Sequence, residues 1–600
     1  MGKDFKLQLG MEFTSTKEFK EVIQEYALLN GRALKFKKND AKRVRVTCQG
    51  SCEFVALCSR VGKTNTFRLK TLVDKHMCNK VFNNKNARSS WVAEKVVDKV
   101  RGSSKTKLSE IIVEIQSKYS ASISIHTAFN ALKKTKNIME GTAKEQYANL
   151  RRYLAEMLRA SNHNTCKLQI ERPQGSLQPI FQRLYMCFEG SKKGFLQGCR
   201  PFIGVDGCHL KTKYGGVLLV AVGRDANDQY FPLAFAVVES ETKDSWKFLL
   251  ELLLDDIGDV RTHRWVFMSD QQKGLLPVFD ELLHGVEHRF CLRHLYNNFK
   301  KKFGAGLMMK TLMHGAANAT FAGAHREKME QIKAIYKEAY DWLEAIPKQA
   351  WCRSAFSFYP KCYVLMNNIS EAFNSTILEA RDKPIITMFE WIRSYLMCRA
   401  ASHREKFTRY EGVVMPKIRR RLDKEIESSD NWFPKLSGEM ILEVTHINLV
   451  EKFIVDLNKH TCTCNFWDLV GIPCRHAVAS IFHKGFNLVD YVADCYKREA
   501  YHRYYNHMIS PINGQNMWPK VEQEPLLPPI FKRRAGRPLK LRRREPDEPT
   551  DKVTKLKRVY TSTMCSKCHQ YGHNARGCRI DRAPNPSVEL PTNVYNMFFL

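Results

Sequence analysis

The sequence predicts a multidomain α+β protein with a central mixed α/β core, and three observations support that fold class. First, 600 residues are too many for one ordinary domain. Second, three short strand-like runs at 201–205, 216–222 and 230–239 are separated by turn residues. Third, an amphipathic helix at 244–257 precedes a strand, a helix and another strand. Meandering strands followed by a βαβ unit indicate a sheet with antiparallel and parallel neighbours.

Helices surround this predicted sheet. The strand, helix and strand that follow the amphipathic helix occupy residues 265–268, 275–283 and 288–292. Residues 296–360 have a mostly helical pattern, and we expect them to form an insertion or lid. A further helix is predicted at 386–403.

The N-terminal part of the chain has a different character. Residues 1–85 combine short strand-like runs, at 43–47 and 66–72, with clustered Cys and His. The region 86–160 is helical in pattern, with three short helices over 88–140 that carry Lys and Arg on their polar faces. Such a unit is helix-turn-helix-like. An ordinary basic helical linker domain explains the same pattern.

The charge balance restricts the class of partner. Lys and Arg total 96 against 62 Asp and Glu, which leaves a net charge of +34. Such an excess indicates a polyanion, most often nucleic acid, and is hard to reconcile with a metabolic enzyme for small molecules. No apolar stretch follows the first residues, and no run approaches the roughly 18 apolar residues of a membrane span. We therefore expect no secretory signal and no membrane partner.

Cysteine and histidine spacing predicts zinc, because Cys beside His in a reducing compartment more often means metal than disulfide. Residues 561–582 have the C-x2-C-x4-H-x4-C spacing of a zinc knuckle, in which three thiolates and one imidazole close a tetrahedral shell. The candidate ligands are Cys565, Cys568, His573 and Cys578. Chance spacing in a disordered tail is the alternative.

A second candidate zinc site lies upstream, at a C-x-C-x9-C-x-H spacing. It comprises Cys462, Cys464, Cys474 and His476. Three sulfurs and one nitrogen again make a closed shell, which is typical of a structural rather than a catalytic ion. Scattered buried cysteines are the alternative.

A third candidate zinc site is spread over two strand-like runs near the N-terminus. Its ligands would be Cys48, Cys52, His76 and Cys78, with Cys58 as a competing ligand. Because the gap between the two pairs is long, buried structural cysteines remain an alternative. The sequence thus predicts two to three structural Zn²⁺ ions.

A basic tail connects the Cys462 site to the zinc knuckle at 561–582. Residues 500–560 are Pro-rich and then strongly basic, which predicts a disordered linker, and residues 583–600 are also expected to be disordered. Within the linker, an AT-hook-like pattern comprises Arg534, Gly536, Arg537, Pro538 and Lys540. Pro fixes an extended backbone, so that Arg537 can enter the narrow minor groove of A·T-rich DNA. A nuclear-import signal or a generic polybasic tail is equally compatible.

Three acidic residues bear on the reaction type. Asp206 and Asp270 each follow an apolar strand-like run, and Glu371 opens a helical run. If the three converge, they can hold two divalent ions that act on a phosphodiester. Asp at strand ends is, however, usually a turn or cap residue.

The segments around these positions resemble a plant Mutator-like element (MULE) transposase. The similar segments are Gly-Val-Asp-Gly-Cys-His-Leu (204–210), Ser-Asp-Gln-Gln-Lys-Gly-Leu (269–275), Cys-Leu-Arg-His (291–294) and Asn-Asn-Ile-Ser-Glu-Ala-Phe-Asn (367–374). The module at 440–485 resembles a SWIM zinc finger, and the AT-hook-like tail and CCHC knuckle follow in the family's order.

The resemblance implies a ribonuclease-H-like DDE domain over 161–425, interrupted by the helical insertion at 296–360. Asp206, Asp270 and Glu371 match the family's catalytic acids, which use Mg²⁺ or Mn²⁺. Cys291 and His294 match its C-x2-H element, for which stabilising the fold is one expected role. Residues 1–85 resemble its DNA-binding region. Gln271 stands where Arg is expected, which removes no metal ligand.

Two functions follow from the resemblance, and a third from the knuckle. The first is a nuclear DNA transposase that binds terminal inverted repeats. Enzymes of this family usually assemble as homodimers on two DNA ends, although the sequence shows no interface signature. The second is a domesticated derivative that binds regulatory DNA sites as a transcriptional regulator without catalysis. The third is an RNA-binding protein.

Overall fold

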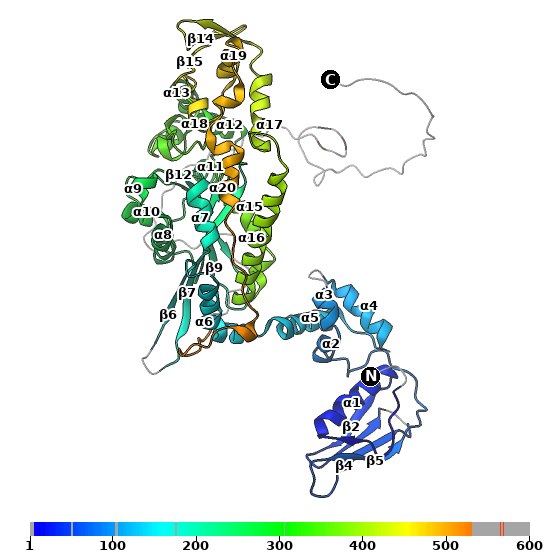
Figure 1. Cartoon of the computed structure of the whole chain (residues 1–600). Helices are drawn as coiled ribbons and strands as arrows, with labels where there is room; N and C mark the ends of the chain where they lie inside the picture. The colour runs from blue at the N-terminus through cyan, green and yellow to red at the C-terminus, as the bar shows by residue number, and fades with distance from the viewer. Residues whose placement is uncertain are drawn as a thin grey trace.

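The computed structural model describes residues 5–49, 52–102, 106–119, 121–173, 177–304 and 306–530, together with Cys565, Cys568 and Gln570. Three sheets organise these residues: a five-stranded sheet near the N-terminus, a seven-stranded sheet in the centre and a four-stranded sheet near the C-terminus (Figure 1). The architecture is multidomain α+β, as predicted. Within the described ranges, no helix is both long enough and apolar enough to cross a bilayer.

The first sheet is antiparallel and carries one helix. Its elements in chain order are β1 (Glu12–Phe13), α1 (Thr16–Leu29), β2 (Leu34–Asn39), β3 (Arg43–Cys48), β4 (Val55–Arg60) and β5 (Phe67–Val73), with strand order β1-β5-β4-β3-β2. The Ser15 side chain caps α1 by accepting the backbone N–H of Glu18. The buried side of α1, including Phe19 and Ile23, shares an apolar cluster with Val44 of β3.

A helical unit with its own core follows this sheet. It consists of α2 (Ser89–Lys95), α3 (Val97–Gly102), α4 (Leu108–Lys118) and α5 (Ile125–Glu140). Its core contains Trp91, Val92, Ile111, Ile115 and Ala128. The first predicted helix is divided into α2 and α3, because the backbone leaves the helical conformation at Val96.

Helix α6 (Ala143–Ala160) lies in the region expected to be a separate helical unit, but it packs on the central domain. The Gln146 side-chain carbonyl accepts the backbone N–H groups of Ile386 and Thr387, at 2.8 and 3.1 Å. The Tyr153 hydroxyl donates to Glu390 at 2.9 Å. These contacts attach α6 to α16 (Ile385–Thr408), which runs alongside the central sheet in Figure 1.

The central sheet is mixed, as the sequence predicted. Its strands are β6 (Thr165–Glu171), β7 (Ile180–Cys187), β8 (Phe202–His209), β9 (Val217–Arg224), β10 (Tyr230–Val238), β11 (Val266–Ser269) and β12 (His288–Phe290), in the order β12-β11-β8-β9-β10-β7-β6. Strands β8, β11 and β12 are parallel, and the other neighbours are antiparallel. The five predicted strands are confirmed, whereas β6 and β7 were not predicted.

Helices cover both faces of this sheet, because side chains alternate between the faces along each strand. On one face, Val205 and Leu219 pack with Trp246 of α8 (Lys243–Ile257). On the other face, Leu218 and Val220 share a cluster with α6, α15 (Asn368–Thr376) and α16. The first face also carries α7 (Glu189–Gly198) and α10 (Leu276–Leu282), with the short α9 (Val260–His263) after α8.

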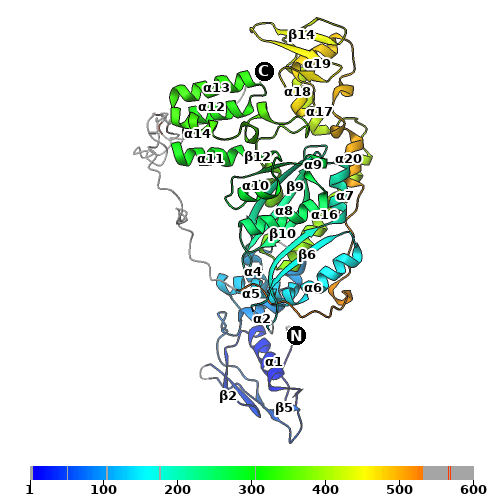
Figure 2. The ribbon, with the colours of Figure 1, turned by 90° about the vertical axis from the view of Figure 1, so that its left-hand side faces the viewer.

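The predicted helical insertion is present between β12 and α15. It contains α11 (Leu292–Phe303), α12 (Leu307–Asn318), α13 (Ala322–Ile335) and α14 (Lys337–Glu344). Figure 2 shows these helices stacked beside the C-terminal sheet. The 3-10 turns η1 (Lys348–Ala350) and η2 (Arg353–Ala355) then return the chain to the central sheet.

The third sheet belongs to a small C-terminal module. After η3 (Ala380–Asp382), α16 and α17 (Pro416–Glu427), the chain forms β13 (Trp432–Leu436), β14 (Ile441–His446), β15 (Lys452–Asp456), β16 (Thr461–Cys462), α18 (Phe466–Val470) and α19 (Arg475–His483). The strands are antiparallel in the order β13-β14-β15-β16. The turns η4 (Leu488–Tyr491) and η5 (Asp494–Tyr496) lead back to the central domain.

Residues 500–530 differ from the expected disordered linker. Helix α20 (Arg498–Tyr505) is tyrosine-rich and buried, and a Cβ at Gly198 of α7 would lie only 2.7 Å from the Tyr504 ring. Beyond η6 (Gln515–Met517), Leu526 is buried and Leu527 exchanges backbone hydrogen bonds with Pro179 and Phe181. The aromatic side chains explain why this segment is ordered, because they bury apolar area against the central domain. The Pro-rich composition alone had predicted disorder.

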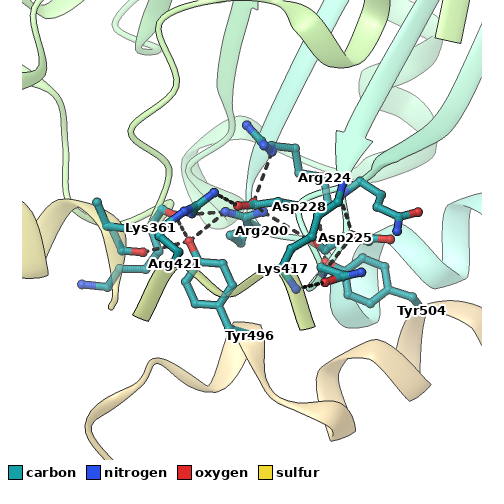
Figure 3. A network of polar contacts seen from close by, with 12 residues as sticks. Arg200, Arg224, Asp225, Asp228, Lys361, Lys417, Arg421, Tyr496 and Tyr504 are labelled. Atoms are coloured by element: carbon teal, nitrogen blue, oxygen red, sulfur yellow. Dashed lines mark hydrogen bonds and ion pairs between the residues drawn. The ribbon is translucent and has the colours of Figure 1, made fainter. Parts of the chain in front are cut away.

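A buried charge network joins the central domain to the two segments that flank the C-terminal module, α17 and η5 (Figure 3). Asp228, in the turn between β9 and β10, forms ion pairs with Arg200, Arg224 and Arg421. Arg200 also donates to the Tyr496 hydroxyl at 3.0 Å, and Arg421 comes from α17. Segments far apart in the sequence thus meet at one buried carboxylate.

Candidate metal centres

Asp206 and Asp270 lie at the same level of the central sheet. Asp206 is in β8, and Asp270 comes directly after the parallel neighbour β11. The pairing of Met268 with Gly204 sets the register, and continuing it by two residues brings Asp270 opposite Asp206. The structure therefore brings these two predicted residues together.

Burial and mutual repulsion make this pair unusual. Burial, followed by the charge of Asp270, raises the pKa of Asp206 to about 6. Burial also raises the pKa of Asp270, although His294 opposes that shift. Asp206 accepts hydrogen bonds from the Gly207 backbone and from the Asn374 side chain, at 2.9 and 2.8 Å. In the described part of the chain, no Lys or Arg forms an ion pair with either Asp.

The N-terminus of α15 docks onto β8 beside this pair. The Asn367 side chain donates to the Val205 carbonyl at 2.9 Å, and the Ser370 hydroxyl donates to the Asn367 side chain at 2.9 Å. A Cβ at Gly204 would meet the Ser370 hydroxyl at 2.8 Å, so the close approach requires glycine. These contacts fix the N-terminus of α15 against β8.

Glu371 has different neighbours from those expected. Its carboxylate forms an ion pair with Arg293, and one of its oxygens lies within 4.8 Å of the Cys291 sulfur and of a His294 ring nitrogen. Among the described residues, no three-ligand group of that tightness contains Glu371 with Asp206 and Asp270. Its charge still contributes to the raised pKa of Asp206.

Cys291 and His294 connect the two acidic segments. The Cys291 backbone N–H donates to Ser269 at 2.8 Å, and its sulfur accepts the Asn367 backbone N–H at 3.4 Å. Interaction with Cys291, and then with the charges of Asp270 and Asp206, raises the pKa of His294. This C-x2-H element thus lies between the end of β11 and the start of α15.

A fourth carboxylate, Glu241, was missed by the sequence analysis. It lies in the turn between β10 and α8, just before the helix N-cap Thr242. Burial, then Asp270 and Asp206, raises its pKa to about 7. The available signal was weak: an acidic residue just before a helix start is common, and only the sheet order brings it close to Asp206.

The predicted C-terminal zinc ligands form a compact buried cluster. The ligand atoms of Cys462, Cys464, Cys474 and His476 all lie within 4.8 Å of one another, and all four residues are buried. His476 is held between the rings of Trp432 and Phe453, with centroids 4.1 and 4.3 Å away. Three sulfurs and one imidazole nitrogen fit a structural Zn²⁺ ion.

The N-terminal candidate ligands also converge. The ligand atoms of Cys48, Cys52, His76 and Cys78 lie within 4.8 Å of one another. The Cys48 and Cys78 sulfurs are 3.3 Å apart, and the His76 ring stacks on Phe54 at 4.4 Å. Cys58, the competing ligand, is buried on β4 and does not belong to this group.

The knuckle and the AT-hook-like motif fall largely outside the described residues. Cys565 and Cys568 are described, whereas His573 and Cys578 are not. Arg534, Gly536, Arg537, Pro538 and Lys540 also lie outside the described ranges.

These features define a class: a multidomain protein with zinc-type Cys/His clusters and, in a mixed α/β domain, an acidic pair that has no Lys or Arg ion-pair partner among the described residues. Family comparisons agree with that class. The MULE transposase domain matches residues 202–298, the SWIM zinc finger matches 446–485, and the MuDR family transposase matches 4–69. A comparison with curated proteins finds no match. The three family matches support membership of the Mutator-like transposase family.

Proposed function

We propose that the protein is a Mutator-like DNA transposase, or a derivative, whose acidic centre cleaves and joins DNA strands with Mg²⁺ or Mn²⁺. The observation that carries the proposal is the partly buried Asp206–Asp270 pair, which lacks a Lys or Arg partner in the described ranges. Carboxylate oxygens are the ligands that these hard cations prefer.

In this proposal Asp206 and Asp270 hold the cations, and Glu371 completes the shell of one of them. When bound, two such ions activate a water or a 3′-hydroxyl and stabilise the leaving oxygen. Asn374 orients the Asp206 carboxylate through its hydrogen bond of 2.8 Å. Glu371 forms an ion pair with Arg293 in this structure, so it would have to leave Arg293 in order to bind a cation.

The finer fold assignment, a ribonuclease-H-like DDE domain, is part of the proposal. It is supported by the antiparallel meander β8–β9–β10 followed by the parallel strands β11 and β12. The position of the acids on β8, after β11 and on α15 beyond a helical insertion also supports it.

The proposed partner is DNA. The net charge of +34 and the match to a MuDR family transposase over 4–69 support this choice, with terminal inverted repeats as the sites. We also propose a nuclear location, a homodimer on two DNA ends, and added affinity from the AT-hook-like motif and the CCHC knuckle.

The test is strand cleavage of labelled inverted-repeat DNA with and without Mn²⁺. We expect Mn²⁺-dependent cleavage by the wild type and none by Asp270→Asn, because the variant removes a charged cation ligand. Asp280→Asn is the matched control, since Asp280 is an exposed acid on α10. Equal products from wild type and Asp270→Asn would contradict the proposal.

A second candidate is a DNA-binding regulator without catalysis. The ion pair of Glu371 with Arg293 favours it, because that carboxylate already has a partner without any metal. Sequence-specific DNA binding by the wild type, unaffected by Mn²⁺ and without cleavage at any site, would favour this second function.

A further inference from the structure

The Glu241 carboxylate lies against the backbone of β8, next to Asp206. A Cβ at Gly207 would lie 2.7 Å from one Glu241 oxygen and 2.8 Å from the carboxyl carbon. Asp206 and Gly207 are successive residues, and the charges of Asp206 and Asp270 both act on Glu241. The Glu241 carboxylate therefore packs on β8 at the residue after Asp206 and is acted on by both Asp charges. Among the described residues, the oxygens of Glu241, Asp206 and Asp270 are not gathered within 4.8 Å of one another, so a shared cation would have to draw them together.

The fold holds Glu241 in this place through the loop that carries Asp270. The Gln272 side chain donates to the Glu241 carbonyl at 3.0 Å and accepts the Leu275 backbone N–H at 2.9 Å. A Cβ at Gly274 would meet the Thr242 backbone at 2.8 Å, so the two loops touch. Glycines at 207 and 274 thus allow three segments to converge on one point.

The charge of Glu241 has no cation to balance it. In the described part of the chain, no Lys or Arg forms an ion pair with Glu241, Asp206 or Asp270. The nearby acids are different, since Glu239 pairs with Arg183 and Glu281 pairs with Lys243. Three partly buried carboxylates without a cation repel one another, and a bound divalent ion removes that repulsion.

An independent observation points to the same ligand. Asn374 is only 8% exposed, and its amide nitrogen donates to Asp206. Its amide oxygen is buried and has no hydrogen-bond partner within the described residues. A buried acceptor without a donor is costly, and an amide oxygen is a suitable neighbour for a hard cation or for its bound water.

We propose that Glu241 is a fourth carboxylate of the acidic centre and supplies an oxygen ligand to the divalent cation held by Asp206 and Asp270. This inference rests on the proposed function of the centre. It also assigns a role to Gly207, which leaves the space that the Glu241 carboxylate occupies.

The test is Mn²⁺ binding to the full-length, zinc-loaded protein, measured by the electron paramagnetic resonance signal of free Mn²⁺. We expect Glu241→Gln to weaken binding about tenfold or more, because the amide keeps the size but removes the charge. Glu281→Gln, the matched control, should bind within about twofold of the wild type, because the exposed Glu281 carboxylate is already paired with Lys243. Gly207→Ala should also weaken binding, since its Cβ displaces the Glu241 carboxylate.

Two results separate this inference from the proposed function. If Asp206→Asn loses Mn²⁺ binding while Glu241→Gln binds like the wild type, Glu241 is not a ligand and the centre itself stands. If the wild type and Asp206→Asn bind Mn²⁺ alike, both claims are overturned. Unfolding without divalent metal checks the fold: removing one of three repelling charges should leave Glu241→Gln as stable as the wild type or more stable.

Discussion

Two carboxylates in the same domain, the buried Asp228 and the partly buried Asp206, have opposite electrostatic surroundings. Asp228 is ringed by Arg200, Arg224 and Arg421, whose charges overcome the effect of burial and hold its pKa far below the usual range. Asp206 has no such arginines: its pKa is raised to about 6 by burial and then by the charge of Asp270, against the opposing effects of the Gly207 backbone N–H and His294. Asp228 lies in the turn between β9 and β10, and Asp206 lies within β8 of the same sheet.

The difference separates a structural charge from a functional one. A carboxylate that leaves water requires a compensating cation. At Asp228 the chain supplies arginines from three segments, and the ion pairs attach α17, which leads into the C-terminal module, to the central domain (Figure 3). At Asp206 the nearest charges are mostly negative, with His294 as the opposing group, and no Lys or Arg among the described residues forms an ion pair with it.

The largest effect is expected where the chain depends most on an outside cation, in the Cys462 module. We expect Cys474→Ser to lose one zinc per chain and to unfold the module, because structural zinc contributes on the order of 10 kcal/mol to folding. Metal analysis and amide hydrogen exchange over 440–485 measure both changes. Cys398→Ser, an exposed cysteine outside the cluster, is the control and should keep its zinc.

Removing the internally balanced charge is the next largest effect. Asp228→Asn leaves three guanidinium groups without their anion, so we expect a loss of about 3–5 kcal/mol in the free energy of unfolding. Denaturant titration measures it. The control Asp423→Asn removes an exposed pair with Arg419 and should cost less than about 1 kcal/mol. Equal losses in the two variants would show that the network does not hold the domains together.

The same contrast explains what the sequence could predict. The spacing of Cys462, Cys464, Cys474 and His476 is short, so local chain geometry alone brings the ligands together. Asp206 and Asp270 could be recognised in the sequence as acids on strand-like runs, but it is the parallel pairing of β8 with β11 that brings them together. The family resemblance added Glu371, whose partner Arg293 is on another helix and is not visible in any spacing.

Other features depended on tertiary contacts that leave no local pattern. Glu241 becomes a neighbour of Asp206 only through the strand order and two glycines. The amphipathic pattern of α6 is compatible with packing on α5 or on α16. Gln146 attaches α6 to α16 by accepting two backbone N–H groups at the start of α16. The tyrosines of α20 lie at the start of a segment whose Pro and basic residues predicted disorder, so their burial was not expected.

The smallest predicted effect is the pH dependence of folding stability, which should have opposite signs for Asp206 and Asp228. Because the folded-state pKa of Asp206 is raised to about 6, the metal-free folded protein binds a proton more tightly than the unfolded chain. The associated stability is present at low pH and is lost as pH rises through that value, by about 1 kcal/mol between about pH 5.5 and about pH 8. Asp228 has the opposite sign: its lowered pKa gives stability that is lost only when pH falls below the ordinary carboxyl range.

Asp206→Asn should therefore remove the loss between the two pH values, and above about pH 7 the variant should be more stable than the wild type without divalent metal. Added Mn²⁺ should reverse this order, because only the wild type keeps the charged ligand. Denaturant titrations of the zinc-loaded proteins, with and without Mn²⁺, make both comparisons. A variant less stable than the wild type in the absence of metal would mean that the fold itself stabilises the Asp206 charge, as it does at Asp228.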